Sequence, residues 1–276
     1  MRATGRRHSL IGRGVVAAAV VLFALAGCSS TSAVTALPTG TGFDYQLGGS
    51  YTPPSGVHVL TRDSTAKPVR GLYNICYVNG FQTQDEDKSF WLTEHPSLIL
   101  RSASGSAVFD PGWPNEMILD VSTAAKRAGI AAVQDVTIDR CEAKGFQAVE
   151  FDNLDSYSRS RHAFTLASDI AMAKLFVRRA HADGLAAGQK NTPELGAQGR
   201  DQVHFDFAVA EECYRYDECS SYTKVYGARV LDIEYTDDLR GTFAHDCASS
   251  SIPAMTILRD RDLVPRGSKG YVYRRC

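Results

Sequence analysis

The chain has 276 residues, of which 44% are hydrophobic and 22% charged, and its formal net charge is −1. This is an ordinary globular composition, and the chain is long enough for one large domain or two small ones. Proteins that follow a nucleic-acid backbone need a clustered basic excess. The sequence has no basic stripe with interleaved aromatic residues, so we expect no nucleic-acid partner.

The N-terminal segment has the pattern of an export signal. Arginines are frequent in the first 14 residues, and a short apolar run follows that ends in Leu-Ala-Gly-Cys28. A basic start followed by an apolar core too short for a comfortable membrane span indicates a secretory signal. The last four residues resemble the lipobox of bacterial lipoproteins, in which the chain is cut before the cysteine and the cysteine is lipidated. We predict a signal peptide over 1–27 and a lipid anchor at Cys28; the small residues before Cys28 disfavour an uncleaved anchor helix.

Residues 28–42 are rich in Ser, Thr, Gly and Pro and have nothing obvious to bury. Such a composition predicts a flexible tether between the anchor and the folded part of the chain. The domain itself is therefore expected over residues 43–276.

Six cysteines remain after Cys28, and an even number in an exported protein indicates disulfides rather than metal ligands. Six cysteines allow fifteen pairings. The short polar spacing between Cys213 and Cys219 favours that pair. A bridge from Cys247 to Cys276 would then hold the C-terminal tail, and it would leave Cys76 with Cys141. The sequence has no CxxC pair or His-rich tract that predicts zinc, and we expect neither a metal nor a cofactor.

Short apolar runs of strand-forming residues recur along the predicted domain. Eight strands are predicted, over residues 43–47, 57–63, 73–80, 146–153, 185–191, 205–212, 228–235 and 252–260. Helical spacing predicts a helix over 167–184, and another over 121–145 that is broken near Gly129. Strands that alternate with helices favour a parallel sheet, and eight of them predict an α/β fold with a single (β/α)8 TIM barrel. The intervals between the first strands are too short for full helices, so this part of the barrel should be irregular.

In a TIM barrel the active site lies at the C-terminal ends of the strands. Nearly all of the predicted strands end in polar or charged residues, namely Gln46, Asp63, Asn79, Asp152, Asn153, Lys190, Asn191, Glu211, Glu212, Glu234, Tyr235, Arg259 and Asp260. A barrel has no reason of stability to end its strands in this way. The pattern therefore predicts that several carboxylates converge on one rim.

The densest group of carboxylates is VEFDNLDSY, residues 149–157. Alternation along a strand places Glu150 and Asp152 on one face. If that face is the barrel interior, Asp152 projects into the mouth of the barrel. A turn or a helix cap would suit Asp155, and also Asn153. Of these residues, we favour a chemical role for Asp152.

A second group is AEECYRYDEC, residues 210–219. A bridge between its two cysteines would stiffen the loop and fix the direction of the carboxylates. Tyr214 would offer a flat apolar face of the kind that sugar sites use. Adjacent residues in a strand point oppositely, so one of Glu211 and Glu212 faces the site and the other is a salt-bridge partner. Because a bulge would invert the parity, parity alone does not choose between them.

Two carboxylates at the mouth of one pocket suit glycoside hydrolysis. One acts as general acid on the leaving oxygen, while the other is nucleophile or base. Nearby like charge and partial burial raise the pKa of one of them and keep it protonated. Lys190 and Asn191 would hold substrate hydroxyls or keep Asp152 ionised; for Lys190 a purely structural ion pair is an equal alternative.

The chain resembles glycoside hydrolase family 114, the endo-α-1,4-polygalactosaminidases. The resemblance runs from about residue 43 to residue 276 and is carried, in the order of the family, by FDYQL, GFQAVEFDNLDSY, GLAAGQKN, FDFAVAEECYRYDEC and ARVLDIEY. It implies a (β/α)8 barrel that acts on α-1,4-linked galactosamine-containing polymers without a cofactor. Asp152 and Glu211 match the positions of the family's catalytic acids. The first strand departs from the family, because many relatives have Trp where this chain has Asp44-Tyr45.

The sequence thus predicts a monomeric, exported lipoprotein, held at the outer face of the cell membrane, that hydrolyses an α-linked amino-sugar polysaccharide. Asp152 and Glu211 share the acid–base and nucleophile roles, with the division between them open. The predicted substrate contacts are Gln46, Asp63, Tyr77, Asn79, Glu150, Asn153, Asp155, Lys190, Asn191, Glu212, Tyr214, Glu234 and Tyr235.

Two alternative functions remain open from the sequence. The first is a non-catalytic glycan-binding lipoprotein that uses the same rim. The second is a calcium-dependent adhesion module built on the DNLD segment, which lacks the spaced ligands and the glycine of a known calcium loop.

Overall fold

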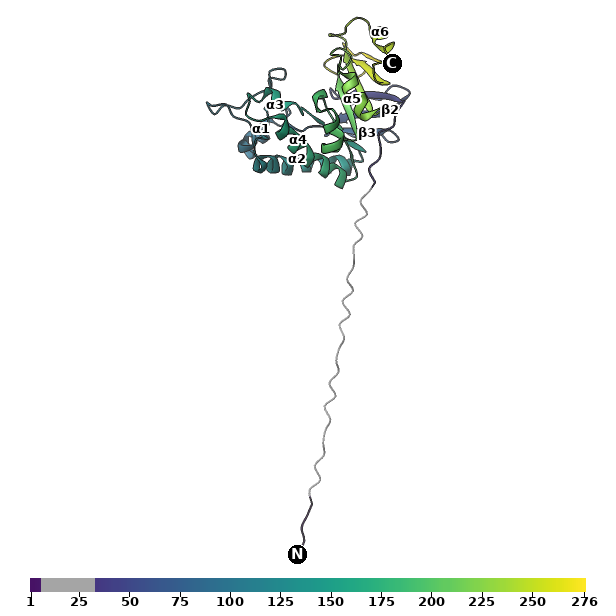
Figure 1. The fold of residues 1–276 in the computed structure, drawn as a ribbon. Coiled ribbons are helices and arrows are strands. Elements are labelled where there is room, and N and C mark those ends of the chain that lie inside the picture. Colours follow the sequence, from purple (N-terminus) through teal and green to yellow (C-terminus); the bar gives the residue numbers. More distant parts are fainter. Residues whose placement is uncertain (6–32) are drawn as a thin grey trace. The chain divides into compact units, whose positions relative to one another are not determined.

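The computed structural model describes residues 1–5 and 33–276 (Figure 1). Cys28 and most of the predicted signal peptide and tether lie outside the described residues. The fold below concerns residues 33–276. Among the described residues, no helix has the length and apolar character that a membrane crossing requires.

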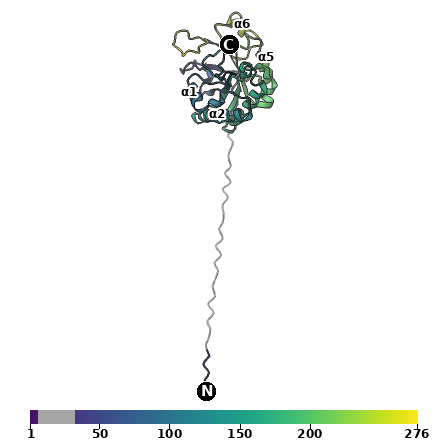
Figure 2. The same cartoon turned by 90° about the vertical axis from the view of Figure 1, so that its left-hand side faces the viewer.

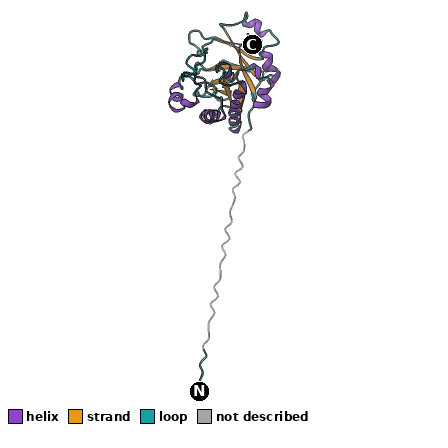
Figure 3. Ribbon diagram, turned by 60° about the vertical axis from the view of Figure 1, so that its left-hand side comes forward, coloured by secondary structure: helices purple, strands orange, loops and turns teal. Residues whose placement is uncertain are grey.

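Nine strands form one sheet in chain order, and Figure 3 shows them at the centre of the fold with helices outside. They are β1 (Gly42–Gln46), β2 (Val57–Asp63), β3 (Tyr73–Asn79), β4 (Ala148–Asp152), β5 (Ala186–Gln189), β6 (Phe207–Glu211), β7 (Val230–Tyr235), β8 (Met255–Arg259) and β9 (Tyr273–Arg275). β1 to β8 pair in parallel with their neighbours, and β9 pairs antiparallel with β8. The sheet curls into a nearly closed barrel. The eight predicted strands are confirmed, and the short β9 is an addition to them.

The helices are unevenly distributed among the connections, and Figure 2 shows α1, α2 and α5 on different sides of the strands. The helical segments are α1 (Lys88–Glu94), η1 (Pro96–Leu98), α2 (Ala124–Lys144), α3 (Ser156–Arg159), α4 (Leu166–Ala182), η2 (Pro193–Leu195), η3 (Gly199–Val203), α5 (Cys219–Tyr226) and α6 (Phe243–Cys247). The connections 47–56 and 64–72 are described throughout and contain no helix. The predicted irregularity of the early barrel is therefore confirmed, and the connections depart from a regular (β/α)8 pattern.

The predicted break at Gly129 is wrong, because α2 is continuous from Ala124 to Lys144. A Cβ at Gly129 would lie 2.9 Å from a methyl group of Leu98. This glycine therefore allows the close approach of α2 to the segment at Leu98. The sequence signal was real, and its cause is packing rather than a helix end.

Alternation along the strands separates two apolar cores. One fills the barrel interior and includes Phe207, Leu231 and Ile257; the other lies between the strands and the outer helices. In β4, Phe151 faces outward and stacks on Phe176 of α4, with 5.1 Å between the ring centroids. Because side chains alternate, the neighbouring carboxylates of β4 face into the barrel.

A buried arginine holds the barrel together where β8 approaches β1. Arg259, at the end of β8, is fully buried and donates to the backbone carbonyl of Tyr45 in β1. Its guanidinium also lies 3.4 Å from the carboxylate of Asp44. From β9, the hydroxyl of Tyr273 donates to the carbonyl of Phe43 at 2.7 Å. Side chains therefore supply contacts between the last and first strands of the sheet.

The last part of the predicted tether packs on the N-terminal end of the barrel. Leu37 is buried and joins the interior core, and the hydroxyl of Tyr73 donates to the carbonyl of Thr35 at 2.8 Å. The expectation that residues 28–42 have nothing to bury is therefore wrong for this part. Since Tyr73 begins β3, the chain enters at the end of the barrel opposite the C-terminal ends of the strands.

The three predicted disulfides are all present. Cys76–Cys141 joins β3 to α2, and Cys247–Cys276 joins α6 to the C-terminal residue. Cys213–Cys219 closes a six-residue span directly after β6. The third bridge lies beside the candidate site.

Candidate active site

The site lies at the C-terminal ends of β4 to β7. Parallel strands end at one edge of a sheet, so residues far apart in the sequence meet there. Asp152 ends β4, Glu211 ends β6 and Tyr235 ends β7. Lys190 directly follows β5, between the two acidic strands in the sheet order.

Lys190 is the centre of the group. It is 2% exposed, and its Nζ lies 2.9 Å from Oδ2 of Asp152 and 3.2 Å from Oε2 of Glu211. These two distances to one atom limit the separation of Oδ2 and Oε2 to their sum, about 6.1 Å. Burial acts to lower the pKa of Lys190, but the charges of Asp152 and Glu211 outweigh it and raise the pKa. The lysine therefore remains a cation between two carboxylates.

Asp152 accepts hydrogen bonds at both oxygens. Tyr77 donates its hydroxyl to Oδ2 at 2.8 Å, and the backbone N–H of Asn153 donates to Oδ1 at 2.8 Å. The ammonium group of Lys190 is the third donor. The three donors thus fix the orientation of the Asp152 carboxylate.

Glu211 has a similar set of donors and more access to solvent. The hydroxyl of Tyr235 lies 2.6 Å from Oε1, and the side-chain amide of Asn191 lies 3.1 Å from Oε2. Burial acts to raise its pKa, but the charge of Lys190 and these hydrogen bonds hold the pKa of Glu211 below its ordinary value. Its side chain is 28% exposed, compared with 13% for Asp152.

Glu150 precedes Asp152 by two residues on the same face of β4, so it lies deeper inside the barrel. It is fully buried and accepts from the hydroxyls of Tyr45, at 2.5 Å, and Thr61, at 3.4 Å. Burial raises the pKa of Glu150 to about 8, against the charge of Lys190. Glu150 is therefore mainly protonated at neutral pH and leaves Lys190 to the two carboxylates at the rim.

Glu212 points away from Glu211 and makes a separate ion pair. Its two carboxylate oxygens lie 2.8 and 2.9 Å from the guanidinium of Arg261, which also lies 4.2 Å from the ring centroid of Tyr235. The backbone of Glu212 has a φ of 59°, so the chain turns sharply after β6. The two adjacent glutamates therefore have different surroundings, and Glu211 is the one beside Lys190.

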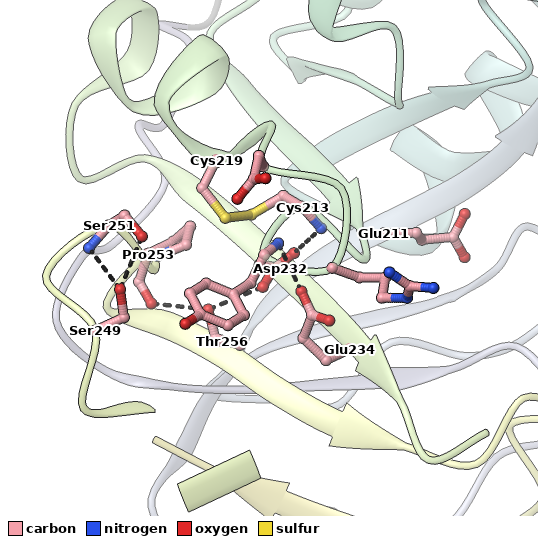
Figure 4. The surroundings of a disulfide bond; sticks show 12 residues. Glu211, Cys213, Cys219, Asp232, Glu234, Ser249, Ser251, Pro253 and Thr256 are labelled. Atoms are coloured by element: carbon pink, nitrogen blue, oxygen red, sulfur yellow. Dashed lines mark hydrogen bonds between the residues drawn. A yellow bond between two sulfur atoms is a disulfide. The ribbon is translucent and has the colours of Figure 1, made fainter. Parts of the chain in front are cut away.

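The disulfide loop supports this turn from behind, and Figure 4 shows Glu211 pointing away from it. The N–H of Cys213 donates to Asp232 at 3.2 Å, and the N–H of Tyr214 donates to Glu234 at 2.8 Å. These two carboxylates alternate with Ile233 and Tyr235, so they lie on the outer face of β7. Glu234 therefore lies beneath the loop, not beside Lys190.

Cys213, Cys219 and Asp232 bring three potential metal-ligating atoms within 4.8 Å of one another. The two sulfur atoms are bonded to each other, so they are not thiolates. A disulfide cannot offer the charged sulfur ligands that zinc prefers. The group is thus part of the loop's support.

Four other predicted contacts lie away from Lys190. Gln46 accepts from Arg62 and donates to Asp44, on the outer face of β1. Asp63 accepts from Thr65 and Gln84, Asp155 pairs with Arg159, and Tyr214 packs its ring near Arg240. The structure assigns each of these side chains a local partner.

Two asparagines and one further carboxylate extend the site on the β3 side. Asn153 donates to the side-chain oxygen of Asn79 at 2.9 Å, and Asn79 in turn donates to Glu116 at 2.9 Å. Glu116 was not among the predicted site residues. It belongs to the long connection between β3 and α2, where no strand or helix pattern in the sequence marks its position. Its neighbour in the hydrogen-bond chain, Asn79, was the available signal.

Comparison with known proteins agrees with this geometry. The model of glycoside-hydrolase family GH114 matches residues 25–276. The chain belongs to family GH114. It is a glycoside hydrolase, as the motifs predicted, and no curated protein sequence matches it.

Two solved structures resemble the hydrolase in fold. Aspergillus fumigatus Ega3, in a complex with galactosamine, matches with a TM-score of 0.68 and 21% identity, over 90% of this chain and 100% of that one. The glycoside hydrolase domain of PelA from Pseudomonas aeruginosa matches with a TM-score of 0.58 and 13% identity, over 82% of this chain and 97% of that one. At these identities the likeness establishes the shared fold.

Proposed function

We propose that this GH114 hydrolase cleaves α-1,4-linked galactosamine-containing polysaccharide, with Asp152 and Glu211 as its catalytic carboxylates. The observation that carries the proposal is the lysine that lies within 3.2 Å of both side chains. The galactosamine bound in the Ega3 structure supports the substrate class. We class the fold as a (β/α)8 barrel with helices missing from its early connections.

The limit of about 6.1 Å between the nearest oxygens fits a retaining mechanism. Retaining glycosidases hold their carboxyl groups about 5–5.5 Å apart, and inverting enzymes about 6.5–9.5 Å apart to admit a water molecule. A direct attack by a carboxylate on the anomeric carbon, followed by hydrolysis, therefore suits this geometry better than a single attack by water.

The nucleophile in this proposal is Asp152, because three donors fix the direction of its carboxylate and it is the less exposed of the two. Its carboxylate attacks the anomeric carbon while the glycosidic C–O bond breaks. Glu211, the more exposed of the two, gives its proton to the leaving oxygen. It then takes a proton from the water that attacks the anomeric carbon and releases Asp152.

The low pKa of Glu211 has a consequence for the pH dependence. The general acid must be protonated in the free enzyme for kcat/KM to be high. Because Lys190 and its other partners hold the pKa of Glu211 below the ordinary value, kcat/KM should fall as the pH rises from acid towards neutral. We therefore expect an acidic optimum.

The remaining contacts fall into two groups in this proposal. Tyr77, Asn79, Asn153, Asn191 and Tyr235 orient the carboxylates and line the mouth, and Glu150 lies below them. Gln46, Asp63, Asp155, Glu212, Tyr214 and Glu234 support loops around the mouth, with sugar contacts confined to units further from the cleaved bond. No cofactor or metal takes part in the proposed steps.

The N-terminal pattern supports an exported lipoprotein with its signal peptide over 1–27 and its anchor at Cys28. Disulfides form and persist in oxidising compartments, which fits export. Thr35 and Leu37 lie at the end of the barrel opposite the site, so anchoring through the preceding residues would leave the rim free for a polymer. All residues of the proposed site belong to one chain, which supports a monomeric enzyme.

The proposal is tested by product analysis on α-1,4-linked galactosamine oligosaccharides. Asp152→Asn and Glu211→Gln should each lower kcat by about 10²–10⁴-fold, because each removes a group that takes part in bond cleavage. Glu142→Gln, the same change on the exposed face of α2, is the control and should keep wild-type turnover. Wild-type activity in both site variants contradicts the assignment. Glycan binding without turnover in the wild type would instead favour a glycan-binding lipoprotein.

A further inference from the structure

A tight turn in the connection between β3 and α2 reaches the rim beside Asp152. Within this turn, Asp110 accepts from the N–H of Gly112 at 2.7 Å, and the N–H of Glu116 donates to the carbonyl of Trp113 at 2.9 Å. The turn exposes 58% of Trp113 and leaves Glu116 half-buried. An exposed aromatic side chain and a partly buried carboxylate are thus presented by the same few residues.

Glu116 is connected to Asp152 through two asparagines. Asn79, which donates to Oε2 of Glu116, is paired across the strands with Asp152 and accepts from the side chain of Asn153. The N–H of Asn153 completes the chain at Oδ1 of Asp152. The position of Glu116 is therefore fixed relative to the proposed nucleophile.

Glu116 differs from neighbouring acids in its lack of a basic partner. Asp152 pairs with Lys190, Asp110 and Asp155 pair with Arg159, and none of the ion pairs among the described residues includes Glu116. The Oε1 atom of Glu116 also has no hydrogen-bond donor among these residues. A half-buried carboxylate of this kind can gain a cation from a ligand.

The surrounding charges make the ionised form of Glu116 costly in the free protein. Burial raises the pKa of Glu116 to about 7, and the negative charges of Asp152 on β4 and Asp110 on its own turn act in the same direction. Lys190 from β5 acts against them, and the phenol of Tyr77 on β3 also faces this region. A bound cation would stabilise the ionised carboxylate of Glu116.

We propose that Glu116 determines specificity by binding the ammonium group of a galactosamine unit next to the cleaved bond. The inference rests on the proposed function and adds a substrate form, since an N-acetylated unit has no ammonium group. Hydrogen bonds to charged groups contribute about 1.5–3 kcal/mol, which corresponds to about 10- to 150-fold in affinity. Trp113 offers an apolar face in the same turn, on which a neighbouring sugar ring can pack.

The test measures binding without turnover, in protein that carries Glu211→Gln. Dissociation constants are measured by calorimetry for two α-1,4-linked oligosaccharides of equal length, one of galactosamine and one of N-acetylgalactosamine. We expect the galactosamine oligosaccharide to bind more tightly. Adding Glu116→Gln should weaken its binding by at least about tenfold and leave binding of the acetylated one unchanged. Adding Glu142→Gln instead, as the control, should change neither.

A pH series tests the same inference without substitution of Glu116. The ammonium group remains charged as the pH falls, whereas Glu116 gains a proton below about pH 7. Binding of galactosamine oligosaccharide should therefore weaken between pH 7 and 5, where the amine stays charged, and binding of the acetylated one should not. This measurement remains decisive if thermal unfolding shows that Glu116→Gln disrupts the fold.

Two results would overturn the inference in distinguishable ways. If neither oligosaccharide binds or is cleaved by the wild type, the proposed substrate class fails and the inference fails with it. If both bind and the preference for galactosamine is the same with and without Glu116, or is absent from the start, the proposed function stands and the role of Glu116 is wrong.

Discussion

Lys190 is 2% exposed and still lies within hydrogen-bond distance of two carboxylates. A buried ammonium group is costly unless it is paired, so its cost is offset by the same anions that it orients. The sequence left a structural ion pair and a role in the site as equal alternatives. Both alternatives hold together, because the residues that pair with Lys190 are the two proposed catalytic carboxylates.

Replacement of Lys190 by methionine tests this dual role. Loss of the positive charge should raise the pKa of Glu211, because burial then acts without opposition from the lysine. The alkaline limb of the kcat/KM profile should move to higher pH, and kcat/KM at the optimum should fall by roughly 10–100-fold. A full pH profile measures both effects.

Lys224→Met, on the exposed surface of α5, is the matched control and should leave the profile unchanged. An unchanged alkaline limb in Lys190→Met would show that Lys190 does not control the general acid. A fall in kcat/KM without a shift of the alkaline limb would show that Lys190 acts only as a structural ion-pair partner.

At the scale of residues, strand parity predicted much of the site. It placed Glu150 and Asp152 on one face of β4, which is the inner face. It could not place Glu234, because both faces of a barrel strand are buried: β7 has Ile233 inside and Asp232 and Glu234 beneath the disulfide loop. Which face is inner depends on the closed sheet, and one strand's sequence does not contain that information.

Among the elements, strands with long apolar runs were predictable and short or polar ones were not. β9 has only three residues, Tyr273–Arg275, and two of them are arginines. It forms because β8 offers an open edge, and the C-terminal disulfide fixes the chain nearby. The part of the connection from β3 to α2 that carries Glu116, residues 99–119, likewise has only isolated bridges and no periodicity. Tertiary contacts determine both segments.

The disulfides allow a prediction that separates stability from activity. Cys76 and Cys141 are 65 residues apart, and Cys213 and Cys219 are six apart. By loop-closure entropy, removing the first pair should cost about 4 kcal/mol of unfolding free energy and the second about 2 kcal/mol. Activity should follow the reverse order, because the shorter loop supports the turn after Glu211.

Double Cys→Ser variants of each pair, compared by denaturant unfolding and by kcat, measure the two effects. Each variant serves as the control for the other. If the variant lacking the Cys213–Cys219 bridge keeps full kcat while folded, this loop does not position Glu211.

At the scale of the whole molecule, the barrel separates the candidate site from the segment at Leu37 that leads towards the predicted anchor. The site lies at the C-terminal ends of the strands, and Leu37 packs at the opposite end. The barrel itself was predictable from eight strand patterns in order. Its closure was not, because it depends on a polar contact, Arg259 with Asp44 and the carbonyl of Tyr45, between residues more than 200 positions apart.

The most direct test of the account follows the first product of the wild-type enzyme on an α-1,4-linked galactosamine oligosaccharide by ¹H NMR. Because Asp152 and Glu211 both lie within 3.2 Å of Lys190, we predict double displacement. The α-anomer should therefore form first, and the β-anomer should appear only by mutarotation. If the β-anomer forms first, a water molecule attacks directly, and the proposed roles of Asp152 and Glu211 are wrong.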